Sequence, residues 1–149
     1  MSSNAKGRGM PTPAKPAVLR PSEIPARQRG GGARTIPLVT RRTGSTSFIN
    51  GITLFEPGAA IPMHRHNCEE SVMLLEGTAI AEIDGVEYPI QAGDITFIPA
   101  NLPHRFRNVS DSEGMKILWI YTSIDATRTL IETGDTRSID EEHKAPVAN

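Results

Sequence analysis

The residues of this chain best suited to chemistry lie in one stretch, GAAIPMHRHNCEESVMLLEG, at positions 58–77. It holds two of the four histidines, His64 and His66, followed by the adjacent Glu69 and Glu70. On an extended strand, His64 and His66 point to the same side, about 6.5 to 7 Å apart. Two imidazoles at that separation can share one metal ion, since each metal–nitrogen bond is about 2.1 Å long. Histidines with this spacing also occur in loops that bind no metal.

Two further residues can complete such a site. Glu70 opens a second apolar run, so a chain that turns after His66 can return this carboxylate to the imidazoles while Glu69 points toward solvent. His104 begins another short run, and Phe106 on the same face is apolar, which indicates an inward-facing histidine. Taken alone, a buried histidine is more often held by hydrogen bonds than by a metal. The pattern makes Glu70 a candidate metal ligand and leaves both interpretations of His104 open.

Length and composition limit the class of protein. At 149 residues and 38% hydrophobic content, the chain is long enough for one domain with a core. It lacks both an apolar run that could span a bilayer and the apolar block of a secretory signal, so we expect a cytoplasmic protein without a membrane partner. Cys68 is the single cysteine, which excludes an intramolecular disulfide and a multi-cysteine zinc site. Nitrogen and oxygen must therefore hold any metal.

The two ends of the chain differ from its middle. Residues 1–42 carry nine Lys and Arg and one acid, whereas residues 43–149 carry seven Lys and Arg and sixteen acids. Because residues 1–33 are basic, rich in proline and glycine and poor in large apolar side chains, we predict a flexible arm there. The arm has no aromatic residue, which disfavours nucleic acid as a partner. The polar residues 135–149 are predicted to form a frayed C-terminal tail.

Between these ends, residues 34–134 show the pattern of an all-β domain. Short β-prone runs alternate with turn residues, and Asp84-Gly85 between two such runs predicts a tight hairpin. The runs cover residues 35–40, 47–55, 71–75, 78–83, 86–90, 94–98, 104–108 and 116–122. Only residues 124–133 are a candidate helix. Many short strands without a helical period predict a barrel or sandwich.

The motifs within this domain resemble those of the cupins, small β-barrel proteins. The first cupin motif spans residues 58–77, and its fixed positions are matched by Gly58, His64, His66, Glu70 and Gly77. The second spans residues 93–108, with Gly93, Pro99, His104 and Asn108 at fixed positions and Asn101 where the family usually has glycine. Asn tolerates left-handed backbone angles, so the turn is expected to survive. The resemblance implies a single RmlC-like jelly-roll barrel of short antiparallel strands.

The resemblance also implies a metal site and a dimer. The family's ligand set falls on His64, His66, Glu70 and His104, which implies one divalent transition-metal ion per chain. Three imidazoles and a carboxylate suit Fe, Mn, Ni, Zn or Cu and do not choose among them. Four protein ligands leave positions open for a small organic substrate or ligand. Barrels of this family commonly form homodimers, so we expect one here.

Further residues are candidates for the surroundings of the metal. We predict that inward-facing apolar side chains line a pocket beside it, although each is as well explained as part of the core. These side chains are Val72, Leu74, Phe97, Phe106 and Trp119. Cys68 lies in the loop between His66 and Glu70, where it is either a redox-sensitive thiol or a small residue filling a tight loop. No catalytic side chain beyond the ligands follows from the sequence.

Three classes of function fit this pattern. Four retained ligands favour a metal-dependent enzyme, either a dioxygenase or a non-redox decarboxylase, isomerase or lyase. The alternative is a non-catalytic cupin that binds or senses a small ligand on the metal without turnover. The third is a metal-free structural or carbohydrate-epimerase-like cupin, which would contain no stoichiometric metal. The motifs specify neither the substrate nor the native metal.

Overall fold

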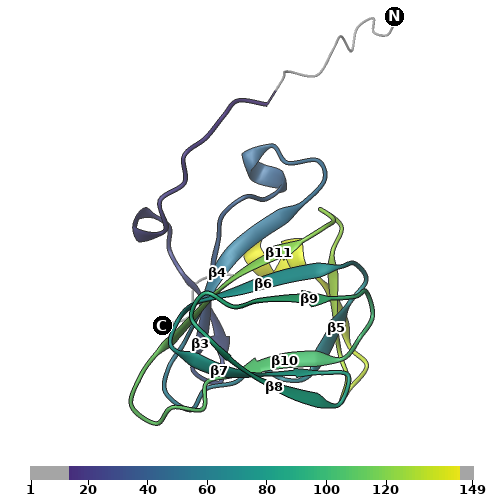
Figure 1. Ribbon diagram of the computed structural model, residues 1–149. Helices are drawn as coiled ribbons and strands as arrows, with labels where there is room; N and C mark the ends of the chain where they lie inside the picture. Colours follow the sequence, from purple (N-terminus) through teal and green to yellow (C-terminus); the bar gives the residue numbers. More distant parts are fainter. Residues whose placement is uncertain (1–13, 145–149) are drawn as a thin grey trace, which may run out of the picture.

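Two six-stranded antiparallel sheets face each other to form a barrel (Figure 1). The computed structural model describes residues 14–144. The histidine sheet has the order β13 (Thr136–Ser138), β12 (Thr127–Leu130), β5 (His64–His66), β10 (His104–Arg107), β7 (Thr78–Ile83) and β8 (Val86–Gln91). The glutamate sheet has the order β2 (Arg27–Gly30), β3 (Ala33–Pro37), β4 (Ile49–Phe55), β11 (Met115–Tyr121), β6 (Glu70–Glu76) and β9 (Ile95–Ile98). The all-β barrel predicted from the sequence is confirmed.

Three short helices complete the described chain. They are the 3₁₀ helices η1 (Pro21–Glu23) and η2 (Arg41–Thr43) and the α-helix α2 (Ile139–Lys144). Among the described residues, none of these helices has the length and apolar character that crossing a bilayer requires. The cytoplasmic location stays a prediction.

The core lies between the sheets because the strands alternate buried and exposed side chains. On β6, Val72 and Leu74 are fully buried, and on β11 Trp119 is 3% exposed. Trp119 donates from Nε1 to Thr53 Oγ1 at 2.9 Å, which satisfies the one polar group of this large side chain. Phe106 on β10 enters the core from the opposite sheet at 2% exposure. Four of the five predicted inward side chains therefore face the interior.

Phe97 is the exception, and the prediction that it faces inward is wrong. It is 64% exposed, because β9 pairs with β6 so that Phe97 lies opposite Ser71 while Ile98 lies opposite the buried Glu70. Since strand neighbours point to opposite faces, Ile98 takes the inward position and is 1% exposed. The sequence pattern of this short strand, Ile-Thr-Phe-Ile, fits either register.

Two turns confirm sequence expectations in detail. Asp84 and Gly85 join β7 to β8 with positive φ angles of 50° and 83°, as a two-residue hairpin of this kind requires. Asn101 has a φ of 69°, so asparagine holds the left-handed turn position that glycine usually takes in the second motif. The turn that precedes His104 therefore forms although asparagine stands in place of the usual glycine.

The predicted flexible arm is wrong for residues 27–33. Arg27–Gly30 and Ala33–Pro37 form a hairpin at the edge of the glutamate sheet, where β3 pairs with β4. Gly30, Gly31 and Gly32 all have positive φ, so the glycine run forms the connecting turn. Residues 1–13 of the predicted arm lie outside the described residues.

The C-terminal predictions are wrong in a similar way. The candidate helix at 124–133 contains a strand, β12, which pairs with β5, and its threonine content suits a strand. The predicted polar tail from residue 135 forms β13 and α2 as far as Lys144. Ile139 and His143 lie four residues apart on one side of α2 and are 1% and 3% exposed, so these two side chains anchor the helix on the barrel. Residues 145–149 of the tail lie outside the described residues.

Candidate metal centre

Three histidines converge inside the barrel from two neighbouring strands. β10 pairs antiparallel with β5 so that His104 lies opposite His64, and His66 follows on the same face of β5. All three are 1–2% exposed. Their ring centroids lie 4.8 Å apart for His64–His66, 4.5 Å for His64–His104 and 5.1 Å for His66–His104. One ligand atom from each lies within 4.8 Å of the others, an arrangement that could hold a metal ion.

Hydrogen bonds to backbone carbonyls fix the orientation of each imidazole. His64 Nδ1 lies 2.8 Å from Pro62 O, His66 Nδ1 2.9 Å from Thr127 O, and His104 Nδ1 2.9 Å from Leu102 O. A carbonyl oxygen can only accept, so each Nδ1 must carry the proton and donate. In the neutral ring, Nε2 is then an unprotonated lone-pair donor, as metal ligation requires.

Glu70 approaches this triad from the opposite sheet. As the first residue of β6 it is 5% exposed, and its Oε1 lies 2.8 Å from His104 Nε2 and 3.6 Å from His66 Nε2. These three atoms are buried and have no hydrogen-bond partner among the described residues. Buried polar atoms without partners are costly, and a shared cation would satisfy them together. The donor set therefore fits a divalent metal ion.

The electrostatics of the triad follow from burial and from Glu70. Burial lowers the pKa of His64 well below its ordinary value, and the neighbouring His104 and His66 lower it further. Burial also lowers the pKa of His66, although Glu70 opposes this effect. For His104, burial acts downward, but the Glu70 carboxylate outweighs it and raises the pKa. His64 and His66 are thus held neutral, the state in which an imidazole binds metal.

The remaining predicted site residues take different positions. Glu69 is exposed, because adjacent side chains on an extended chain point to opposite faces and the neighbouring Glu70 points inward. Cys68 is half-buried in the loop between β5 and β6, and burial raises the pKa of its thiol. A raised pKa leaves less of the reactive thiolate, which counts against a redox-sensitive role. Val72, Leu74, Phe106 and Trp119 are buried in the core, and their pocket-lining role stays a prediction.

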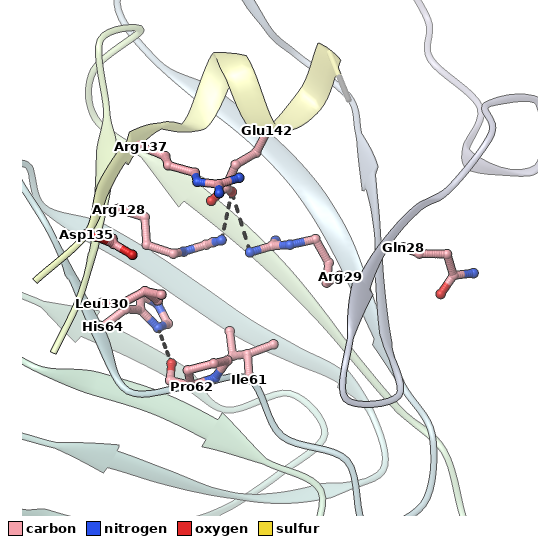
Figure 2. A pocket seen from close by; sticks show the side chains of 10 residues that line it. All are labelled: Gln28, Arg29, Ile61, Pro62, His64, Arg128, Leu130, Asp135, Arg137 and Glu142. Carbon is pink, nitrogen blue, oxygen red and sulfur yellow. Dashed lines mark hydrogen bonds and ion pairs between the residues drawn. The ribbon is translucent and has the colours of Figure 1, made fainter. Parts of the chain in front are cut away.

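A cavity of about 290 Å³ opens beside the triad, with His64 in its wall (Figure 2). Three arginines line it, of which Arg29 on β2 and Arg128 on β12 share one carboxylate, Glu142 on α2. Sequence reasoning missed these residues, because each lies in a segment predicted to be an arm, a helix or a frayed tail. Only the pairing of those segments with the barrel brings them to the cavity. No local sequence signal marks them.

Comparisons with known proteins agree with this geometry. A family description, "Cupin domain", matches residues 51–121. Polyketide synthase CurC of Streptomyces cyaneus is 38% identical over 105 residues, which cover 69% of this chain and 68% of the relative. Protein SchB of Streptomyces halstedii is 32% identical over 126 residues, covering 84% of this chain and 89% of the relative.

Among solved structures, the polyketide cyclase RemF of Streptomyces resistomycificus superimposes with a TM-score of 0.68 at 18% identity. The superposition covers 84% of this chain and 86% of RemF, so the two share a fold. The same barrel carries the two histidine motifs at 58–77 and 93–108 and a histidine triad positioned for a metal. The chain therefore belongs to the cupin superfamily.

Proposed function

We propose that this protein is a metal-dependent enzyme whose ion is held by His64, His66, Glu70 and His104. The observation that carries the proposal is the convergence of buried, unpartnered Nε2 and Oε1 atoms from two sheets. In a folded protein such atoms normally find partners, and a closed cluster of them is explained most simply by a cation. One divalent ion per chain is expected, of Fe, Mn, Ni, Zn or Cu.

The substrate class that we favour is a small organic molecule with several carbonyl groups. A bound ion would supply Lewis acidity at a carbonyl, enolate or carboxylate oxygen. CurC is called a polyketide synthase, and a polyketide chain is a series of such carbonyls. Within the proposed enzyme classes, this relationship favours non-redox chemistry, such as ring closure with loss of water, over oxygen chemistry.

The chain's own residues would bind the substrate and limit its exposure to water. Ile61 and Leu130 give the cavity beside His64 an apolar side, which suits a carbon skeleton. Tyr121 lies next to the triad, with its ring centroid 4.4 Å from that of His66. Burial and the nearby Glu70 raise the pKa of Tyr121 well above its ordinary value, so its hydroxyl stays protonated and can donate a hydrogen bond.

The proposal is tested first by metal content and then by turnover. Elemental analysis of protein purified without added metal should find about one transition-metal ion per chain. The protein loaded separately with zinc, manganese or iron is then incubated with linear di- and triketo acids, and products are identified by mass spectrometry. A ring-closed product with loss of water, formed equally with and without oxygen, supports the non-redox enzyme.

The other functions predict different results. Oxygen incorporation that stops under anaerobic conditions would indicate a dioxygenase. Tight ligand binding without product would indicate a binding or sensory cupin, and absence of stoichiometric metal would exclude every metal-dependent function at once.

We propose in addition that the chain forms a homodimer through the outer face of the glutamate sheet. Five strands place one apolar side chain each in a continuous cross-strand row on the face turned away from the core. The row consists of Ile36, Ile52, Leu118, Met73 and Ile95, of which Ile52 is already buried within the single chain at 9% exposure. Ile95 and the neighbouring Phe97 are 61% and 64% exposed, which is unfavourable for large apolar side chains in water. A second copy of the same sheet face would cover them.

A further inference from the structure

The charge in the wall of the cavity beside His64 is unbalanced. Arg29, Arg128 and Arg137 supply three guanidinium groups, whereas Asp135 and Glu142 supply two carboxylates. Glu142 Oε1 is shared, at 2.7 Å from Arg128 Nη1 and 3.4 Å from Arg29 Nη2. Figure 2 shows the three guanidinium groups gathered near this one carboxylate, on the wall that faces His64. Arginines in excess over carboxylates favour an anionic ligand.

Two independent observations indicate that this wall is incomplete. Arg128 is 7% exposed, and its Nε is buried without a hydrogen-bond partner among the described residues. Arg128 also lies directly opposite Arg137 in the pairing of β12 with β13. Like charges at directly opposed positions destabilise a sheet, and the nearby Glu142 carboxylate is already shared between Arg128 and Arg29. The structure keeps this arrangement at the edge of a cavity, where an anion from solution can reach it.

We propose that Arg29, Arg128 and Arg137 form a carboxylate-binding subsite for an organic acid that reaches toward His64. The guanidinium fork matches the two oxygens of a carboxylate, while Ile61 and Leu130 contact the carbon skeleton. This subsite refines the proposed function, on which it rests: the substrate is a free acid, held by its carboxylate at the cavity wall while another oxygen reaches the metal.

The test measures binding of benzoate, with benzamide as a neutral analogue of the same shape, by calorimetry at constant ionic strength. Both are titrated into metal-free and zinc-loaded protein and into two variants, Arg29→Gln and Arg137→Gln. Arg137 is exposed, so its replacement leaves the fold intact even if the Arg29 variant is destabilised. Arg41→Gln is the matched control, because Arg41 pairs with Asp125 at the surface away from the cavity lining.

We expect benzoate to bind both metal-free and loaded protein and benzamide to bind neither. Each cavity variant should weaken benzoate binding at least about tenfold, since a hydrogen bond to a charged group is lost, and Arg41→Gln should not. Equal binding of benzamide, or unchanged benzoate binding in both variants, would overturn the subsite. Benzoate binding that needs zinc and ignores the arginines would also overturn it but leave the metal enzyme standing. Arginine-dependent binding in a chain that takes up no metal would support the subsite and refute the proposed function.

Discussion

Glu70 Oε1 on β6 lies 2.8 Å from His104 Nε2 on β10, so a carboxylate of one sheet meets an imidazole of the other inside the barrel. Neither atom has a hydrogen-bond partner among the described residues, because His104 already donates from Nδ1 to Leu102 O. The contact therefore requires a cation or an additional proton to be favourable. It also joins the two motifs of the sequence, since Glu70 and His104 are more than thirty residues apart in the chain.

The first prediction concerns the choice between the adjacent glutamates. Glu70→Gln should weaken zinc binding at least about tenfold, because the carboxylate that lies beside His66 and His104 loses its charge. Glu69→Gln is the matched control, since Glu69 is exposed and one residue away on the other face. Affinities are measured by competition with a chromophoric chelator. Equal weakening by the two substitutions would mean that the wrong glutamate has been assigned.

A second prediction concerns stability after metal removal. Treatment with a chelator should lower the melting temperature, because the unprotonated Nε2 atoms of the triad lose their shared partner, and added zinc should restore it. At a free metal concentration one hundred times the dissociation constant, binding to the folded state adds about 2.7 kcal/mol. His66→Ala should abolish the response to zinc in differential scanning calorimetry. A response that survives in His66→Ala would place the metal elsewhere.

The third prediction concerns packing under the site. Gly51 on β4 faces Trp119, and a Cβ added there would lie 2.4 Å from Cζ2 of its ring and 2.7 Å from Ile36 O. Gly51→Ala should therefore cost about 1–3 kcal/mol of unfolding free energy, as overpacked cores do. In Gly114→Ala, the new Cβ meets only Phe55 O, at 3.6 Å, so that variant should be nearly neutral. Urea denaturation of both variants checks the difference, and similar midpoints would contradict it.

The sequence predicted the strands of the candidate metal centre well and the segments near the two ends of the chain poorly. The strands that carry His64, Glu70 and His104 are bounded by turn residues with strong local preferences, such as Gly77 after β6 and Asn101 before β10, and the two motifs fix the spacing of the three residues. Turns predicted from such residues are found in the structure because the local backbone preference agrees with the overall fold. Phe97 failed because a one-residue change of register exchanges the two faces of a short apolar strand.

The cavity wall could not be predicted for a different reason. Arg29, Arg128 and Glu142 belong to β2, β12 and α2, segments whose composition alone favours no stable structure. They are ordered by pairing with strands distant in sequence, for example β12 with β5, and by the buried side chains of α2. Tertiary contacts of this kind override local propensity, and local patterns in the sequence do not reveal them.

The fourth prediction concerns the proposed dimer. Ile95→Lys should shift the protein toward monomers, because a charge at this exposed end of the apolar row would be buried without a partner. Val109→Lys is a suitable control, since Val109 is 49% exposed in the loop after β10 and is not part of the apolar row. Sedimentation velocity over a range of concentrations measures the association. If the wild-type chain is monomeric throughout, or if both variants dimerise alike, the glutamate sheet is not the interface.

The last prediction concerns pH and a histidine outside the metal centre. His143 of α2 is 3% exposed and stacks on Trp119 with ring centroids 5.5 Å apart. Burial lowers its pKa from 6.5 to about 4, in spite of the opposing charge of Glu142. As the pH falls below 6.5, the unfolded chain takes up a proton at this residue and the folded chain does not, until the pH reaches about 4. Stability should therefore be full above that window and fall within it, by about 2 kcal/mol at about pH 5 from this residue alone.

His143→Phe isolates this contribution, because phenylalanine keeps an aromatic ring against Trp119 and cannot take up a proton. The unfolding free energy of both proteins is measured by urea denaturation at about pH 7 and about pH 5, in the presence of a chelator so that the metal ligands do not contribute differently. The variant should lose less stability than the wild type between these two conditions, and the difference should be about 2 kcal/mol. Parallel losses in the two proteins would mean that His143 is protonated, or exposed, in the folded state.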